Sequence, residues 1–116
     1  MQDSPLNKFD AIHHIAIQVA SISDSVNWYR GSFACEVLSQ DTTHALLQFQ
    51  NIKLTLILPS QEPNHLAFVR EDANTLGELR EKKEGLRSCF IADPSGNPVE
   101  IIETSSLSQK YPGESA

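Results

Sequence analysis

The sequence has few cysteines, little positive charge and no long apolar run, and each shortage excludes a class of protein. Its two cysteines, Cys35 and Cys89, form no Cys-x-x-Cys pair. We therefore expect two free, partly buried thiols, with a disulfide or thiol chemistry as the alternative. Lys and Arg number 9 against 15 Asp and Glu, which gives a net charge of −6. Nucleic acid or an anionic membrane surface would need a basic patch, so neither is an expected partner.

The chain also lacks the apolar stretches that direct a protein to a membrane or out of the cell. Its longest apolar run, from Leu54 to Leu58, is interrupted by Thr55 and is far too short to cross a bilayer. Residues 1–10 show no positively charged start followed by an apolar core, so no secretory signal is predicted. These features predict a cytoplasmic protein, and 116 residues suit a single domain.

What the sequence does contain is a series of short strands with alternating apolar residues, and two segments with helical spacing. This mixture predicts an α+β fold. We expect residues 1–11 to be an N-terminal arm, 12–103 the domain, and 104–116 a flexible tail. The predicted strands are 12–19, 36–39, 45–49, 52–58, 65–69, 88–92 and 98–103, and the predicted helices are 21–32 and 73–83.

The domain repeats itself. Residues 12–58 and 65–103 each fit the order β-α-β-β-β, with His14 and His65 in matching positions 51 residues apart. The final strands match at an offset of 45, which pairs Thr55 with Glu100. The second module is therefore shorter, and we expect its second strand to be vestigial or missing.

The repeat brings four side chains to corresponding places. His14, Thr55, His65 and Glu100 each lie on the strand face opposite the apolar packing face. Two imidazoles and one carboxylate make a facial ligand set for iron, zinc, manganese, nickel or cobalt, with positions left open. Calcium would want more oxygen ligands. An inherited site that binds no metal is the alternative.

Other polar residues are weaker candidates. Thr55, Gln18 and Lys53 lie on the predicted cavity face as candidate substrate-binding residues, with solvation as the alternative for Gln18 and Lys53. Glu100 is a ligand, a proton-transfer base, or both. His13 is expected to face the packed side of its strand, and His44 to lie near a turn, so neither is expected to be functional.

Several segments together resemble the vicinal oxygen chelate superfamily, which includes glyoxalase I, extradiol dioxygenases and bleomycin-resistance proteins. The most specific is the closing segment, which is similar to the family's D-P-x-G-N-x-x-E-L motif. The resemblance extends from about Ile12 to Glu103 and is carried by HHIAIQV at 13–19, Trp28-Tyr29, NHLAF at 64–68 and DPSGNPVEI at 93–101.

The resemblance implies two β-α-β-β-β modules that form a curled mixed sheet around a cavity, usually in a homodimer. It also implies metal ligation by His14, His65 and Glu100. The family often has Glu, Gln or His where Thr55 stands, and Thr is a poor ligand. The three remaining residues match the His-His-Glu arrangement of extradiol dioxygenases and fosfomycin-type thiol transferases.

The sequence therefore favours a divalent-metal-dependent enzyme whose small substrate chelates the metal through vicinal oxygens. Dioxygenase, lyase and isomerase chemistry all stay open, and lyase or isomerase chemistry would need a base in the cavity. The alternatives are a non-catalytic small-molecule binding protein of the bleomycin-resistance type, and a degenerate member of the superfamily.

Overall fold

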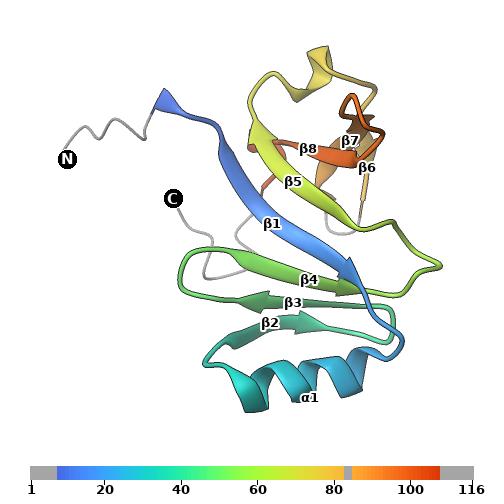
Figure 1. Ribbon diagram of the computed structural model, residues 1–116. Coiled ribbons are helices and arrows are strands. Elements are labelled where there is room, and N and C mark those ends of the chain that lie inside the picture. The colour runs from blue at the N-terminus through green and yellow to red at the C-terminus, as the bar shows by residue number, and fades with distance from the viewer. Residues whose placement is uncertain (1–7, 83–84, 108–116) are drawn as a thin grey trace.

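The computed structural model describes residues 8–82 and 85–107, which form one mixed, open sheet and a single α-helix. The α+β class expected from the sequence is confirmed. The eight strands lie in the order β2-β3-β4-β1-β5-β8-β7-β6 (Figure 1). They are β1 (Ala11–Gln18), β2 (Glu36–Gln40), β3 (His44–Gln48), β4 (Lys53–Ile57), β5 (His65–Arg70), β6 (Arg80–Glu81), β7 (Arg87–Ala92) and β8 (Pro98–Glu103).

The first module consists of β1, the helix α1 (Ile22–Ser32) and β2 to β4. The helix begins where the sequence predicts, because the Ser21 hydroxyl accepts a hydrogen bond from the Asp24 backbone N–H at 3.2 Å. Its buried side includes Val26, which packs in one cluster with Leu47 and Leu56 of the sheet. This covers the outer face of the first module and leaves its opposite face for the cavity.

The centre of the sheet explains why the candidate residues meet. β1 pairs parallel with β4, β5 pairs parallel with β8, and β1 joins the modules by pairing antiparallel with β5. The first and last strands of both modules therefore occupy the four central places, β4-β1-β5-β8. Those strands carry Thr55, His14, His65 and Glu100, respectively.

The second module departs from expectation between β5 and β7. The helix predicted over 73–83 is wrong over its described part, 73–82: the chain forms a 3-10 turn, η2 (Ala73–Thr75), and then the short strand β6, while residue 83 lies outside the described residues. Gly77 shows the physical reason, because its backbone lies against β7, where a Cβ would be 3.0 Å from the Cys89 sulfur. Glycine is also a poor helix former. The second strand, expected to be vestigial or missing, is present as the two residues of β6.

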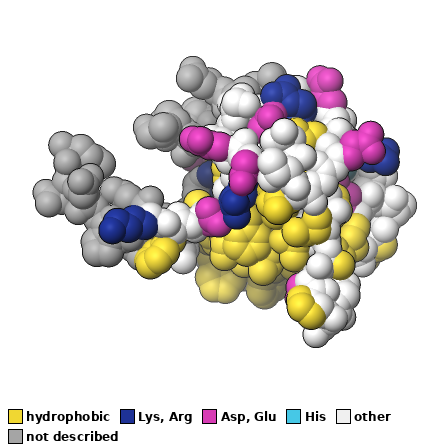
Figure 2. Space-filling view, turned by 90° about the horizontal axis from the view of Figure 1, so that it is seen from above, with side chains coloured by type: hydrophobic (Ala, Val, Ile, Leu, Met, Phe, Trp, Pro, Cys, Tyr) yellow, Lys and Arg dark blue, Asp and Glu magenta, His cyan; other side chains and the backbone are white. Residues whose placement is uncertain are grey.

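This half of the molecule leaves three large apolar side chains partly exposed. Leu66, Leu76 and Phe90 are each about 40% exposed. Seen from above, apolar side chains form a continuous area edged by charged ones (Figure 2). The covered core of this half is small and centres on Ala73, Cys89 and Ile101. Both cysteines are free, as expected.

The segment that follows β8 is tied to the sheet. After β8 the chain forms η4 (Thr104–Ser106), inside the stretch expected to be a flexible tail. The Ser106 hydroxyl accepts a hydrogen bond from the Arg87 backbone N–H at 2.9 Å. The rest of that expected tail, 108–116, and residues 1–7 of the expected arm lie outside the described residues. Among the helices that are described, none is long and apolar enough to span a membrane.

Candidate metal centre

Three side chains converge where the two modules join. His14, His65 and Glu100 project from the adjacent strands β1, β5 and β8. The register pairs Ala16 with His65 and Ala67 with Glu100, which brings the three side chains to one face of the sheet. One ligand atom from each residue lies within 4.8 Å of those of the other two.

His65 is fixed by hydrogen bonds at both ring nitrogens. Its Nδ1 lies 2.8 Å from the Pro63 carbonyl oxygen, which can only accept, so Nδ1 carries a proton. Its Nε2 lies 3.0 Å from Glu100 Oε1. Burial opposes the charged imidazole, but the hydrogen bonds to Glu100 and Pro63 raise the pKa of His65 above its ordinary value. Without a bound metal ion, the protonated Nε2 of His65 therefore donates a hydrogen bond to Glu100 Oε1.

Glu100 is buried, yet both of its carboxylate oxygens have partners. Oε1 faces the imidazoles, while Oε2 accepts hydrogen bonds from Ser88 Oγ at 2.7 Å and Lys82 Nζ at 2.8 Å. Burial by itself raises the pKa of such a carboxyl, but the His65 hydrogen bond and the Lys82 charge outweigh burial and hold it well below its usual range. Glu100 is therefore an anion in this environment.

His14 completes the group and is neutral. Burial lowers the pKa of His14 to about 3, although the Glu100 charge acts in the opposite direction. Its Nδ1 lies 2.8 Å from Nδ1 of His13, and its Nε2 lies 3.6 Å from Glu100 Oε1. The uncharged ring can thus use one nitrogen for His13 and present the other to the group.

The donor set fits a divalent transition metal. Two imidazole nitrogens with one carboxylate oxygen suit iron, zinc, manganese, nickel or cobalt. Two donors, each about 2.1 Å from a common ion, are about 3.0–3.6 Å apart at bond angles of about 90–120°. The distances from Glu100 Oε1 to His65 and His14 are 3.0 and 3.6 Å. The Nδ1–H···O=C bond of His65 is also the support that metal-binding histidines usually have.

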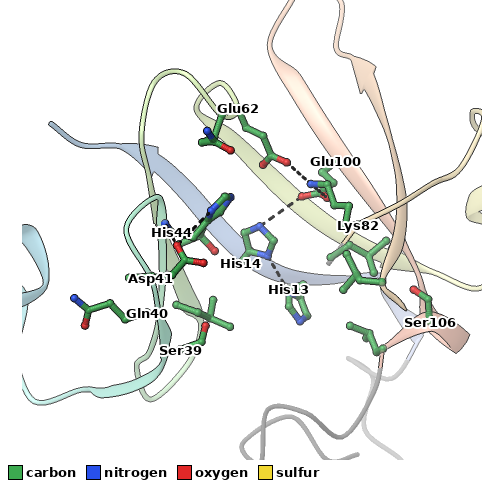
Figure 3. A pocket seen from close by; sticks show the side chains of 17 residues that line it. His13, His14, Ser39, Gln40, Asp41, His44, Glu62, Lys82, Glu100 and Ser106 are labelled. Atoms are coloured by element: carbon green, nitrogen blue, oxygen red, sulfur yellow. Dashed lines mark hydrogen bonds and ion pairs between the residues drawn. The ribbon is translucent and has the colours of Figure 1, made fainter. Parts of the chain in front are cut away.

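The group opens onto a cavity of about 500 Å³ on this face of the sheet. Glu62 and Lys82 lie on one side of it, and His44 and Asp41 on the other (Figure 3). Its apolar wall comes from the sheet and from the segments on either side of β7 and β8. These wall residues are Ala45, Leu46, Leu86, Ile102 and Leu107.

Solved structures resemble the fold of this chain over most of its length. A hypothetical protein from Bacillus halodurans has a TM-score of 0.63 and 19% identity, covering 80% of this chain and 93% of that one. A Streptomyces coelicolor methylmalonyl-CoA epimerase bound to 2-nitronate-propionyl-CoA has a TM-score of 0.63 and 21% identity, covering 78% and 94%. A protein described as NAD-dependent benzaldehyde dehydrogenase from Legionella pneumophila has a TM-score of 0.60 and 14% identity, covering 77% and 96%.

The epimerase is a member of the vicinal oxygen chelate superfamily. The present chain has the vicinal oxygen chelate fold. No protein-family model and no curated protein matches the sequence. Because these three structures are 14–21% identical to the chain and carry different names, their likeness establishes the fold and transfers no activity.

Within the vicinal oxygen chelate fold, the three proposed substrate-binding residues have different places. Thr55 on β4 lines the cavity. The Gln18 side chain donates to the Glu62 carbonyl at 2.9 Å, and its backbone N–H donates to Asn64 Oδ1 at 2.6 Å. Gln18 therefore anchors the loop that carries Glu62. Neither Gln18 nor Lys53 is among the cavity-lining residues.

Two histidines that were not expected to be functional also line the cavity. His13 was expected on the packed side of β1, but the register against β5 shifts between Ile12 and His14. Such a bulge breaks the two-residue alternation and turns His13 toward the cavity. His44 Nδ1 lies 2.7 Å from Thr43 Oγ1 at the opposite wall. The bulge has no signal in the sequence, so alternation alone could not find His13.

Sequence reasoning also missed the residues that surround Glu100. Lys82 lies near the end of the helix predicted over 73–83, and Ser88 at the start of a predicted strand, so neither position indicates a site residue. Glu62 lies in a polar linker. Ser88 could have been found, because it is two residues from Phe90, which pairs with Glu100 across β7 and β8. Lys82 and Glu62 reach the site from loops, where no periodicity applies.

Proposed function

We propose that this protein is a divalent-metal-dependent enzyme whose small substrate chelates the metal through two vicinal oxygens. One observation carries the proposal: His14, His65 and Glu100 place their ligand atoms within 4.8 Å of one another at a cavity. A volume of about 500 Å³ suits a small organic molecule. Iron, zinc, nickel, manganese and cobalt are the candidate metals.

The protein's own contribution is to hold three ligands in place. The Pro63 carbonyl keeps the proton of His65 on Nδ1, so Nε2 can bind a cation once its own proton leaves. His14 is neutral, and Glu100 supplies the one negative charge. A divalent cation held there supplies a Lewis acid that stabilises negative charge developing on substrate oxygens.

The substrate would lie between the three ligands and the apolar wall. Three protein ligands leave positions for two vicinal oxygens, and Thr55 offers a hydroxyl on the same wall. Leu46 and Ile102 would contact the apolar part of the molecule. Because Glu100 Oε2 is occupied by Lys82 and Ser88, Glu100 acts as a ligand rather than as a mobile base.

The competing function is metal-free binding of a small molecule, and one observation favours it. His65 and Lys82 already compensate the charge of Glu100 without any metal. For the metal-dependent enzyme, three reaction types stay open: that of a dioxygenase, a lyase or an isomerase. The homodimer implied by the family resemblance stays a prediction, which light scattering on the purified protein would test.

Titration with divalent ions decides between the metal-dependent and metal-free alternatives. Wild type, His14→Ala and His65→Ala would be titrated calorimetrically with Mn²⁺, Fe²⁺, Co²⁺, Ni²⁺ and Zn²⁺. His44→Ala is the matched control, because His44 lines the cavity outside the ligand group. The proposal predicts that one or more ions bind wild type and the control, and bind both ligand variants far more weakly. Equal binding by all four proteins would contradict it.

A further inference from the structure

The two oxygens of Glu100 have separate tasks. Oε1 faces the imidazoles of His65 and His14. Oε2 is held on the opposite side by Ser88 at 2.7 Å and Lys82 at 2.8 Å. A carboxylate in this position can offer a cation one oxygen, because the second is already bound to two donors.

Lys82 is itself held from several sides. Its Nζ binds Glu62 as well as Glu100 and lies 5.2 Å from the centre of the Phe90 ring. Phe90 in turn packs edge-on against His65, with ring centroids 4.9 Å apart. Figure 3 shows the ammonium group between the two carboxylates at the edge of the cavity. A cation fixed in this way is part of the site rather than a mobile surface charge.

The position of Lys82 sets up a competition between two cations. A divalent ion at the ligand group and the ammonium of Lys82 would share the charge of Glu100, one at each oxygen. The divalent ion and the Lys82 ammonium would both be positive and close together beside the buried Glu100, so they would repel each other strongly. Lys82 also neutralises Glu62, which would otherwise add to the attraction for a cation.

We propose that Lys82 is a positioning residue that restricts Glu100 to one-oxygen coordination and weakens the binding of the divalent metal. This inference rests on the proposed function. Its consequence is a metal with fewer protein donors and with more positions open to substrate. It also assigns a task to the unusual second module, because Lys82 follows β6 where the predicted helix is missing.

The test compares the affinity for Mn²⁺, measured by electron paramagnetic resonance, in wild type and Lys82→Met. We expect tighter binding in Lys82→Met, on the order of tenfold or more, because the substitution removes a positive charge that repels the divalent ion. Lys82→Arg keeps the cation and should bind as wild type does. Lys8→Met removes an equal charge from an exposed position outside the cavity and should also match wild type.

A second readout follows the coordination itself. The visible spectrum of bound Co²⁺ depends on the number and geometry of its ligands, so it should change in Lys82→Met and keep its wild-type form in Lys82→Arg. If Lys82→Met does not fold, Lys82→Gln keeps an N–H donor for Glu100 without the charge. It should show the same tighter binding.

The possible failures are distinguishable. If wild type binds Mn²⁺ and His65→Ala does not, the proposed function stands. Equal or weaker binding by Lys82→Met and Lys82→Gln then overturns the role of Lys82 alone. If neither wild type nor the Lys82 variants bind any divalent ion, the proposed function and this inference are both overturned.

Discussion

Replacing Glu100 by Gln should destabilise the metal-free protein more than any single change at an exposed carboxylate. The substitution keeps the shape of the side chain and removes its charge. Glu100 is 1% exposed and lies at the centre of a network with His65, Lys82 and Ser88. An amide in its place would present N–H groups where one or more of these donors now bind an acceptor.

The size of the expected loss of stability depends on which partners of Glu100 are left with an uncompensated charge. Removing one member of a buried ion pair typically costs 3–5 kcal/mol. The lower end applies here, because Lys82 keeps Glu62 and is 29% exposed, and because His65 can release its proton. We expect a loss of about 3 kcal/mol from a total stability of roughly 5–15 kcal/mol. With a urea dependence of about 2 kcal/mol/M, the unfolding midpoint falls by about 1.5 M.

Urea unfolding at neutral pH in the presence of EDTA measures this difference. Glu36→Gln is the control, because Glu36 is exposed at the start of β2 and its substitution should change stability by less than about 0.5 kcal/mol. Equal midpoints for Glu100→Gln and Glu36→Gln would refute the buried network on which the site depends.

Three further predictions test the fold around the site. Gly77→Ala should lower stability by about 1 kcal/mol in thermal unfolding, because its Cβ would crowd the Cys89 sulfur at 3.0 Å; an unchanged melting temperature would contradict that close packing. Ser21→Ala should cost about 1 kcal/mol by removing the helix cap, measured in the same way. Asp93→Ala should destabilise at neutral pH, because hydrogen bonds from Asn97 lower the pKa of Asp93. The stabilisation by ionised Asp93 is complete above the ordinary pKa of about 3.9 and is lost as the pH falls below it. The melting curves of wild type and Asp93→Ala should therefore differ at pH 7 and converge in acid.

Most of the sheet could be predicted from the sequence, because two-residue alternation is a local signal. Corresponding positions in the repeat then related His14 to His65 and Thr55 to Glu100. Strand order was not needed for that step, since a duplicated module places equivalent strands symmetrically. The structure has these four residues on the four adjacent central strands.

What could not be predicted depends on contacts between distant residues. The helix expected over 73–83 does not form. At Gly77 the backbone lies close to the Cys89 side chain of β7, and this contact depends on the folded sheet rather than on local spacing. The bulge that turns His13 toward the cavity is equally invisible in a single strand. Lys82 reaches Glu100 across 18 positions of sequence, through a segment with no regular spacing. The candidate ligands were therefore accessible to sequence reasoning, and their surroundings were not.

The most direct test of the metal centre is the metal content of the protein purified without a metal-affinity tag. Mass spectrometry would compare wild type with Glu100→Ala, each checked for folding by circular dichroism. The proposed function predicts near-stoichiometric iron, zinc, nickel, manganese or cobalt in wild type and a large loss in the variant. Absence of metal from both proteins, even after incubation with these divalent ions, would contradict it.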